Sequence, residues 1–185
     1  MNQFAHFPAN YAVHLDQELP GSGGEIPIFT AGRSGRVPPG VDGPLLGIEP
    51  VSGPRWLAYF ANGYRSDDVV DAVFTTPDPD AVCVVARGAG YWVNVHKRDK
   101  VNVPVFPIRQ VEVTDDKIIF VDFTRLASFC SSGLEWISEH LTFDRLKISE
   151  LDVVQKVAVC HGWDAPSCKE TELSVNLRTG QRILE

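Results

Sequence analysis

The densest group of chemically versatile side chains in the sequence lies between residues 160 and 171. His161, Trp163 and Asp164 occur there close together, and Arg178 follows shortly afterwards. A loop that combines tryptophan with polar groups is typical of a recognition surface, because tryptophan and arginine are enriched where binding energy concentrates. We therefore predict that His161, Trp163, Asp164 and Arg178 bind a partner or ligand from a loop inserted between two strands. The alternative is a purely structural loop whose Trp163 packs back onto the sheet.

Two kinds of chemistry remain open for this segment. His161 and Asp164, with Arg125 or Arg178, would bind or transform a small molecule if their side chains converged in a cleft. Without such convergence, the segment would serve protein recognition and no catalysis. The histidines and serines match no nucleophile or zinc-protease motif that we can identify. We therefore favour a non-enzymatic role, and no catalytic residue is assigned.

The cysteines indicate neither a metal site nor a cofactor. Cys83, Cys130, Cys160 and Cys168 contain no C-x-x-C pair, and their spacing fits no zinc finger or ribbon. A zinc ion held by residues of the 160–171 segment would need a distant ligand such as His96. We expect free cysteines, no bound metal and no cofactor.

Charge and hydropathy narrow the range of partners. The 185 residues carry 17 basic and 24 acidic side chains, for a formal charge of −7. This acidic balance argues against nucleic acid, whose phosphates require clustered Lys and Arg. No apolar run approaches the roughly 18 residues that span a bilayer, and no basic and apolar leader opens the chain. We expect a cytoplasmic protein whose partner is another protein or a second copy of itself, with no membrane contact.

The secondary structure expected to position these residues differs between two parts of the chain. Of the 15 glycines and 13 prolines, 17 lie before residue 55, and neither residue type supports a long helix or a central strand. We predict that residues 1–54 form an irregular arm packed on the body, with one short strand around residues 26–30. From residue 55 to 185, short β-branched and aromatic runs alternate with turns, which predicts a mainly antiparallel β domain.

The second part of the chain, residues 55–185, contains an internal repeat. The segments 71–85, 109–121 and 147–159 each read as a short strand, an acidic turn and an apolar strand. Asp78, Asp115 and Asp152 occupy the turns at a constant spacing of 37 residues. In a second register, residues 126–136 align without gaps to residues 173–183, and Gly133 falls on Gly180. Each glycine is expected where a turn needs a positive φ.

The stretch 118–136, with two strands and a turn ending in Gly-x-x-Trp, resembles a blade of the quinoprotein-type β-propellers. The stretch from residue 56 to the end also resembles a family of uncharacterised bacterial proteins. These resemblances imply a fold and no activity. They fit a bacterial accessory or immunity-type protein that binds a protein partner.

About three such units are too few for a closed ring, since propellers use four to eight blades. Three arrangements would still bury the sheet faces: a two-sheet sandwich or partial barrel, an incomplete propeller completed by a dimer, or an open stack covered by the arm. We favour the first.

Overall fold

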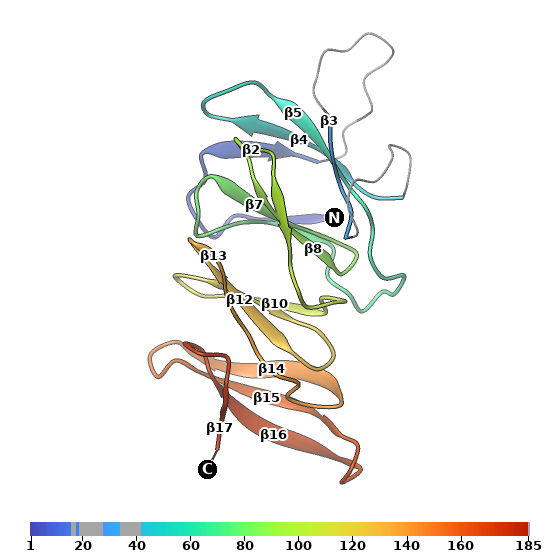
Figure 1. Cartoon of the computed structure of the whole chain (residues 1–185), viewed down its shortest axis with the longest axis vertical. Helices are drawn as coiled ribbons and strands as arrows, with labels where there is room; N and C mark the ends of the chain where they lie inside the picture. The colour runs from blue at the N-terminus through green and yellow to red at the C-terminus, as the bar shows by residue number, and fades with distance from the viewer. Residues whose placement is uncertain (16–17, 19–27, 34–41, 185) are drawn as a thin grey trace.

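The computed structural model describes residues 1–15, 18, 28–33 and 42–184, which form 17 β-strands in four sheets. The sheets lie one above another along the longest axis of the molecule (Figure 1). No helix that could cross a membrane occurs in the described part of the chain. The expectation of a mainly β protein is therefore confirmed.

We number the sheets from the N-terminal end of the stack. Sheet I has the spatial order β2 (Tyr11–His14), β4 (Leu45–Pro50), β5 (Trp56–Phe60), β3 (Ile28–Ala31). Sheet II has the order β1 (Asn2–Phe4), β6 (Ala72–Thr75), β7 (Ala81–Ala86), β8 (Ala89–Asn94), β9 (Lys100–Asn102). Sheet III comprises β10 (Gln110–Val113), β11 (Ile118–Val121), β12 (Leu126–Cys130) and β13 (Gly133–Ile137). Sheet IV comprises β14 (Asp144–Asp152), β15 (Val157–Asp164), β16 (Lys169–Asn176) and β17 (Arg182–Ile183).

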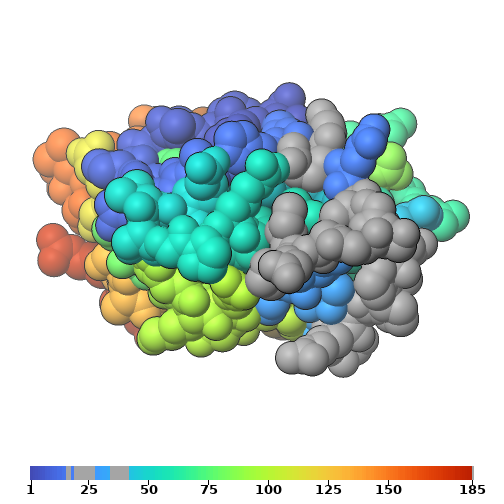
Figure 2. All heavy atoms as spheres, turned by 90° about the horizontal axis from the view of Figure 1, so that it is seen from above, coloured from blue at the N-terminus to red at the C-terminus, as the bar shows by residue number. Residues whose placement is uncertain are grey.

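The segment predicted to be an irregular arm contributes strands to two sheets. The strand β1 joins the edge of sheet II, where it runs parallel to β6. The strands β2, β3 and β4 combine with β5 to make sheet I, and β3 runs parallel to β5. The end of the stack formed by sheet I is covered with N-terminal residues, drawn in blue to cyan (Figure 2). The short strand expected at residues 26–30 is present as Ile28–Ala31, while residues 26 and 27 lie outside the described part. The division at residue 54 stays a prediction, although β4 and β5 pair across it.

Three apolar cores separate the four sheets, and each core draws on two neighbouring sheets. The strand β7 in the middle of the stack is a continuous apolar run because both of its faces are buried. Its residues alternate between two cores: Val82, Val84 and Ala86 face sheet I, and Ala81, Cys83 and Val85 face sheet III. Every sheet face inside the stack is thus buried by the next sheet.

The stack differs from the arrangement that we favoured. None of the four sheets closes into a barrel, and four layers rather than two form the body. A partial barrel is therefore wrong, and the observed arrangement is an open stack. The reason is that the interior strands are apolar on both faces, so each sheet needs two covering layers where a two-sheet sandwich provides one.

The three repeated segments coincide with the first hairpins of sheets II, III and IV. Residues 71–85 hold β6 and β7, residues 109–121 hold β10 and β11, and residues 147–159 hold most of β14 and the start of β15. Of the three spaced aspartates, Asp78 and Asp115 lie in the connections between these paired strands, and Asp152 is the last residue of β14, next to the turn. The sequence pattern therefore located equivalent hairpins.

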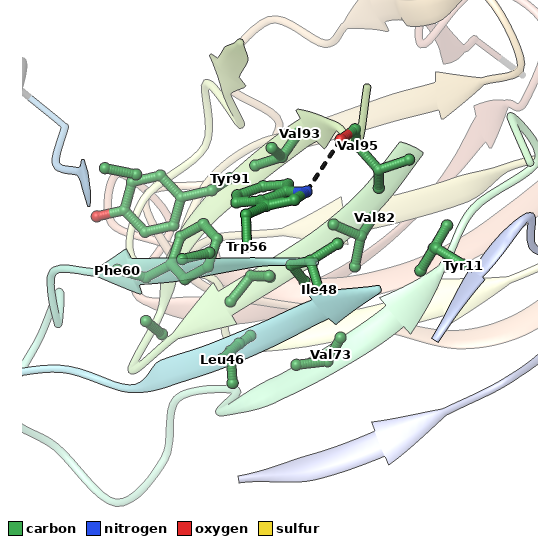
Figure 3. Packing of buried hydrophobic residues seen from close by; sticks show 14 of the residues in the cluster. Tyr11, Leu46, Ile48, Trp56, Phe60, Val73, Val82, Tyr91, Val93 and Val95 are labelled. Atoms are coloured by element: carbon green, nitrogen blue, oxygen red, sulfur yellow. Dashed lines mark hydrogen bonds between the residues drawn. The ribbon is translucent and has the colours of Figure 1, made fainter. Parts of the chain in front are cut away.

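A tryptophan makes the same contact at two of the three sheet junctions. The indole Nε1 of Trp56 donates to the carbonyl oxygen of Val95 at 3.1 Å, across the junction of sheets I and II (Figure 3). The indole Nε1 of Trp136 donates to the carbonyl oxygen of Leu177 at 3.1 Å, across the junction of sheets III and IV. Each acceptor follows an asparagine at the start of a hairpin turn, Asn94 or Asn176.

The glycines at positions 133 and 180 allow a direct test of this junction. Both have a positive φ, 98° and 71°, but a Cβ at Gly180 would lie 2.4 Å from Cε3 of Trp136, whereas one at Gly133 meets nothing within 4 Å. We expect Gly133→Ala to lower the free energy of unfolding by about 1 kcal/mol through backbone strain alone. Gly180→Ala should cost roughly 2–3 kcal/mol, because Trp136 must also move. Urea unfolding of the two variants measures the difference, and equal losses would contradict the close contact.

Candidate functional site

The segment expected to be an inserted loop is a β-hairpin. The strands β15 and β16 are eight residues long each and pair as far as Asp164 and Lys169, so residues 165–168 alone form the turn. The Oδ2 atom of Asp164 accepts the backbone N–H of Ser167 at 3.1 Å, and Cys168 closes the turn at a φ of 51°. The prediction of an inserted loop is wrong, because β15 and β16 are longer than the corresponding strands β11 and β12 of sheet III and include the extra residues.

The four predicted binding residues do not converge. His161 and Trp163 lie two residues apart on β15, so both side chains project from the face of sheet IV that is turned away from the stack. Asp164 is committed to the β15–β16 turn, whereas Arg178 lies in the β16–β17 turn at the other end of the hairpin. Arg125 lies in the connection between β11 and β12, where its Nη2 atom is 3.6 Å from Oδ2 of Asp122. His161 and Asp164 therefore do not line a common cleft.

His161 and Trp163 belong instead to a broad face, which we call the outer face of sheet IV. Its centre is the solvent side of β15, because Ala158 and Cys160 point the other way into the core shared with sheet III. The residues on this side are only partly buried: Val157, Val159, His161 and Trp163. The outer face therefore presents an apolar strip along one strand.

Charged side chains of opposite sign flank the strip. On the β14 side, Lys147 pairs with His161 in the strand register, and the guanidinium of Arg145 lies 6.0 Å from the centre of the Trp163 ring. On the β16 side, the register places Glu172 beside His161 and Glu170 beside Trp163. The Nε2 atom of His161 is 3.4 Å from Oε2 of Glu172, and both side chains are solvent-exposed. On the β14 side the strip is thus flanked by Lys147 and Arg145 near Trp163 and by Glu150 opposite Val159, whereas the β16 side is acidic.

Sequence reasoning singled out His161 and Trp163 but missed their apolar neighbours. Val157 and Val159 were counted only as part of a strand. The informative signal in the sequence is the neighbouring strand β14, where the apolar Leu146 and Ile148 alternate with polar residues, in contrast to the unbroken apolar runs of β7 and β11. A strand covered on one face only has this period of two.

The two most buried thiols are unsuited to nucleophilic chemistry. Burial raises the pKa of the Cys160 thiol to about 12, and it raises the pKa of the fully enclosed Cys83 thiol further. A thiol is a nucleophile only as the thiolate, so both groups are protonated and unreactive near neutral pH. All four cysteines are free. In the described part of the chain, no three His, Cys, Asp or Glu side chains are grouped to hold a metal ion.

Comparison with known proteins gives this chain no relative: neither a known family nor a curated protein matches it. The fold and the outer face of sheet IV are therefore the basis on which its function is argued.

Proposed function

We propose that this protein is a non-enzymatic module that binds a protein partner through the outer face of sheet IV. The observation that carries the proposal is the partly exposed apolar strip of Val157, Val159 and Trp163 on a sheet whose other face is buried. The remaining sheets differ: the central strands β7, β8, β11 and β12 of sheets II and III are buried on both faces, and at the far end Leu57 and Tyr59 of β5 are buried as well. An accessory or immunity-type role is consistent with such a module.

The form of the face favours a protein over a small ligand. Small-molecule sites are concave and enclose most of their ligand, whereas this face is one side of a sheet formed by extended strands. An apolar centre with charged residues around it is the usual anatomy of a protein interface. Lys147 on the β14 side and Glu172 on the β16 side would also select the orientation of a charged partner.

We further propose that the sheets are propeller-blade-like repeats, stacked as an incomplete propeller. Support comes from the equivalent first hairpins of sheets II, III and IV and from the matching indole contacts of Trp56 and Trp136. In a stack of such units the last blade has one face without a neighbour, which is the face assigned here to partner binding.

Replacing Val159 with lysine is expected to weaken partner binding at least tenfold, because an ammonium would be desolvated at the centre of the interface. Lysine at this position should not destabilise the unbound protein, since the carboxylate of Glu150 lies opposite Val159 in the strand register. The measurement is affinity capture of partners from the native cell by tagged protein, with bound proteins quantified by mass spectrometry. The matched control is Val101→Lys, on an exposed valine of β9 in sheet II.

The proposal requires one protein that the wild type and Val101→Lys both capture and that Val159→Lys loses. Capture that is equal for both variants, or no capture by the wild type, would overturn it. Light scattering of the purified wild type tests whether the partner is a second copy of the chain. A dimer that Val159→Lys converts to a monomer would identify that second copy as the partner. Melting temperatures of both variants should stay close to that of the wild type.

A further inference from the structure

We propose that a groove between sheets III and IV binds a small molecule through a phosphate or carboxylate group. The groove has a volume of about 400 Å³ and is lined by Arg109, Gln110, Arg145, Leu146 and Lys147. It lies where β10 and β14, the first strands of the two sheets, run past each other. Arg145 and Lys147 also flank the outer face of sheet IV, whereas Arg109 and Gln110 of the groove lie outside that face.

Three cations line the groove of a protein whose net charge is −7. Arg109 alone has an acidic partner, since its Nη2 atom lies 3.0 Å from Oδ2 of the half-exposed Asp68. Among the described residues, no carboxylate forms an ion pair with Arg145 or Lys147. The groove therefore combines positive charges that the protein itself leaves largely uncompensated.

Aromatic rings hold the two guanidinium groups. The guanidinium of Arg109 lies 4.6 Å from the centre of the Phe123 ring, and that of Arg145 lies 6.0 Å from the centre of the Trp163 ring. A planar guanidinium stacked on a ring keeps its N–H edge free for a bidentate contact with an oxyanion. The Nε atom of Arg109 is buried and makes no hydrogen bond to the described residues.

Hydrogen bonds fix the two walls of the groove to each other. The side chain of Gln110 binds the backbone of Ile148 twice: its Nε2 donates to the carbonyl oxygen at 2.9 Å, and its Oε1 accepts the N–H at 3.0 Å. The backbone N–H of Leu146 also donates to the carbonyl oxygen of Phe123 at 3.0 Å. The cations are thus brought together without a ligand, so binding would require little reordering.

A bulge in β14 places Arg145 at the groove. The register between β14 and β15 shifts between Asp144 and Lys147, and Arg145 adopts a φ of 57°. Residues other than glycine rarely occupy this region, and bulges commonly redirect a side chain next to a functional site. A role of Arg145 in ligand binding would therefore explain the bulge and the positive φ.

The shared chemistry of the ligand is an oxyanion. Arginine forks and a lysine ammonium match the oxygen atoms of phosphate and carboxylate groups. The partly buried ring of Phe123 beside Arg109 offers apolar surface for the body of the molecule. Phosphate and carboxylate are distinguished by the test below.

The test is a titration of the isotope-labelled full chain, followed by amide NMR shifts, with sodium phosphate and with citrate at constant ionic strength set by chloride. We expect saturable shifts around residues 109–110 and 145–147, with a Kd of about 1 mM or below for the preferred anion. Tighter binding of phosphate identifies a phosphorylated ligand, and tighter binding of citrate identifies a carboxylate.

The double variant Arg145→Gln/Lys147→Gln should weaken this binding at least tenfold, as should Arg109→Gln. The control Lys97→Gln removes an exposed cation from the β8–β9 turn and should change the Kd less than twofold. All the altered side chains reach solvent, and the spectra themselves report whether each variant is folded. Absence of saturable shifts at these residues with both anions would overturn the proposal, as would equal weakening by the control.

Discussion

Replacing Trp56 with alanine is expected to lower the free energy of unfolding by about 4 kcal/mol. The indole is fully buried between sheets I and II (Figure 3). The ring of Phe29 packs against it edge-on, with 5.8 Å between the ring centres. The substitution opens a cavity and also leaves the carbonyl oxygen of Val95 without its indole donor. Domains are stable by only 5–15 kcal/mol, so the urea midpoint should fall steeply.

Two further variants separate the contributions to this loss. Trp56→Phe keeps most of the apolar volume but removes the hydrogen bond, and we expect a loss of about 1–2 kcal/mol. Trp163→Ala removes the same type of side chain from the outer face of sheet IV, where it is only partly buried, and should cost less than about 1 kcal/mol. A loss for Trp56→Ala no larger than that for Trp163→Ala would contradict the assigned role of Trp56 at the junction.

Replacing Asp122 with alanine is expected to cost about 3 kcal/mol. Its side chain is almost fully buried after β11, and Oδ1 accepts the backbone N–H groups of Thr124 at 2.8 Å and Arg125 at 2.7 Å. The Oδ2 atom accepts the N–H of Phe106 at 3.3 Å, which ties the end of sheet II to sheet III. Alanine leaves these donors without an acceptor, and each buried unpaired donor is costly. The guanidinium of Arg125 would lose its carboxylate as well.

Asp152 supplies the matched control for this variant. It makes the same turn, since its Oδ1 accepts the backbone N–H groups of Val154 at 3.0 Å and Gln155 at 2.8 Å, but it is exposed. Water replaces the carboxylate there, so Asp152→Ala should cost about 1 kcal/mol. Chemical denaturation of both proteins at one pH measures the contrast. Equal losses would mean that the burial of Asp122 is unimportant for stability.

Much of the strand content could be predicted because β-branched runs and turn residues are local signals. The run at 81–86 is β7, and the repeated segments at 71–85 and 109–121 are hairpins. The number of layers was also encoded, though it was not recognised. β7 and β11 are apolar without interruption because cores lie on both sides, while Leu146 and Ile148 of β14 alternate with polar residues because one side of sheet IV faces solvent. Comparing these patterns distinguishes interior sheets from a terminal one.

The remaining features depend on contacts between distant parts of the chain. The pairing of β1 with β6 joins residues about 70 positions apart, and no local pattern in Asn2–Phe4 indicates it. The candidate groove is equally non-local, because Arg109 and Arg145 come from different sheets. For Asp164, no sequence pattern distinguishes a ligand contact from the turn contact with Ser167 that the structure contains.

The chain order of the stack has a consequence for synthesis on the ribosome. Sheets III and IV are each made from one continuous stretch, so each can form as soon as its strands emerge and can fold onto the sheet already made. Sheet II is the exception, because β1 must wait until β6 has been synthesised. Nascent strands therefore find an apolar template at every later step, and long-range searching is confined to the first half of the chain. Slow folding steps should be sought there rather than in the half that carries the proposed binding face.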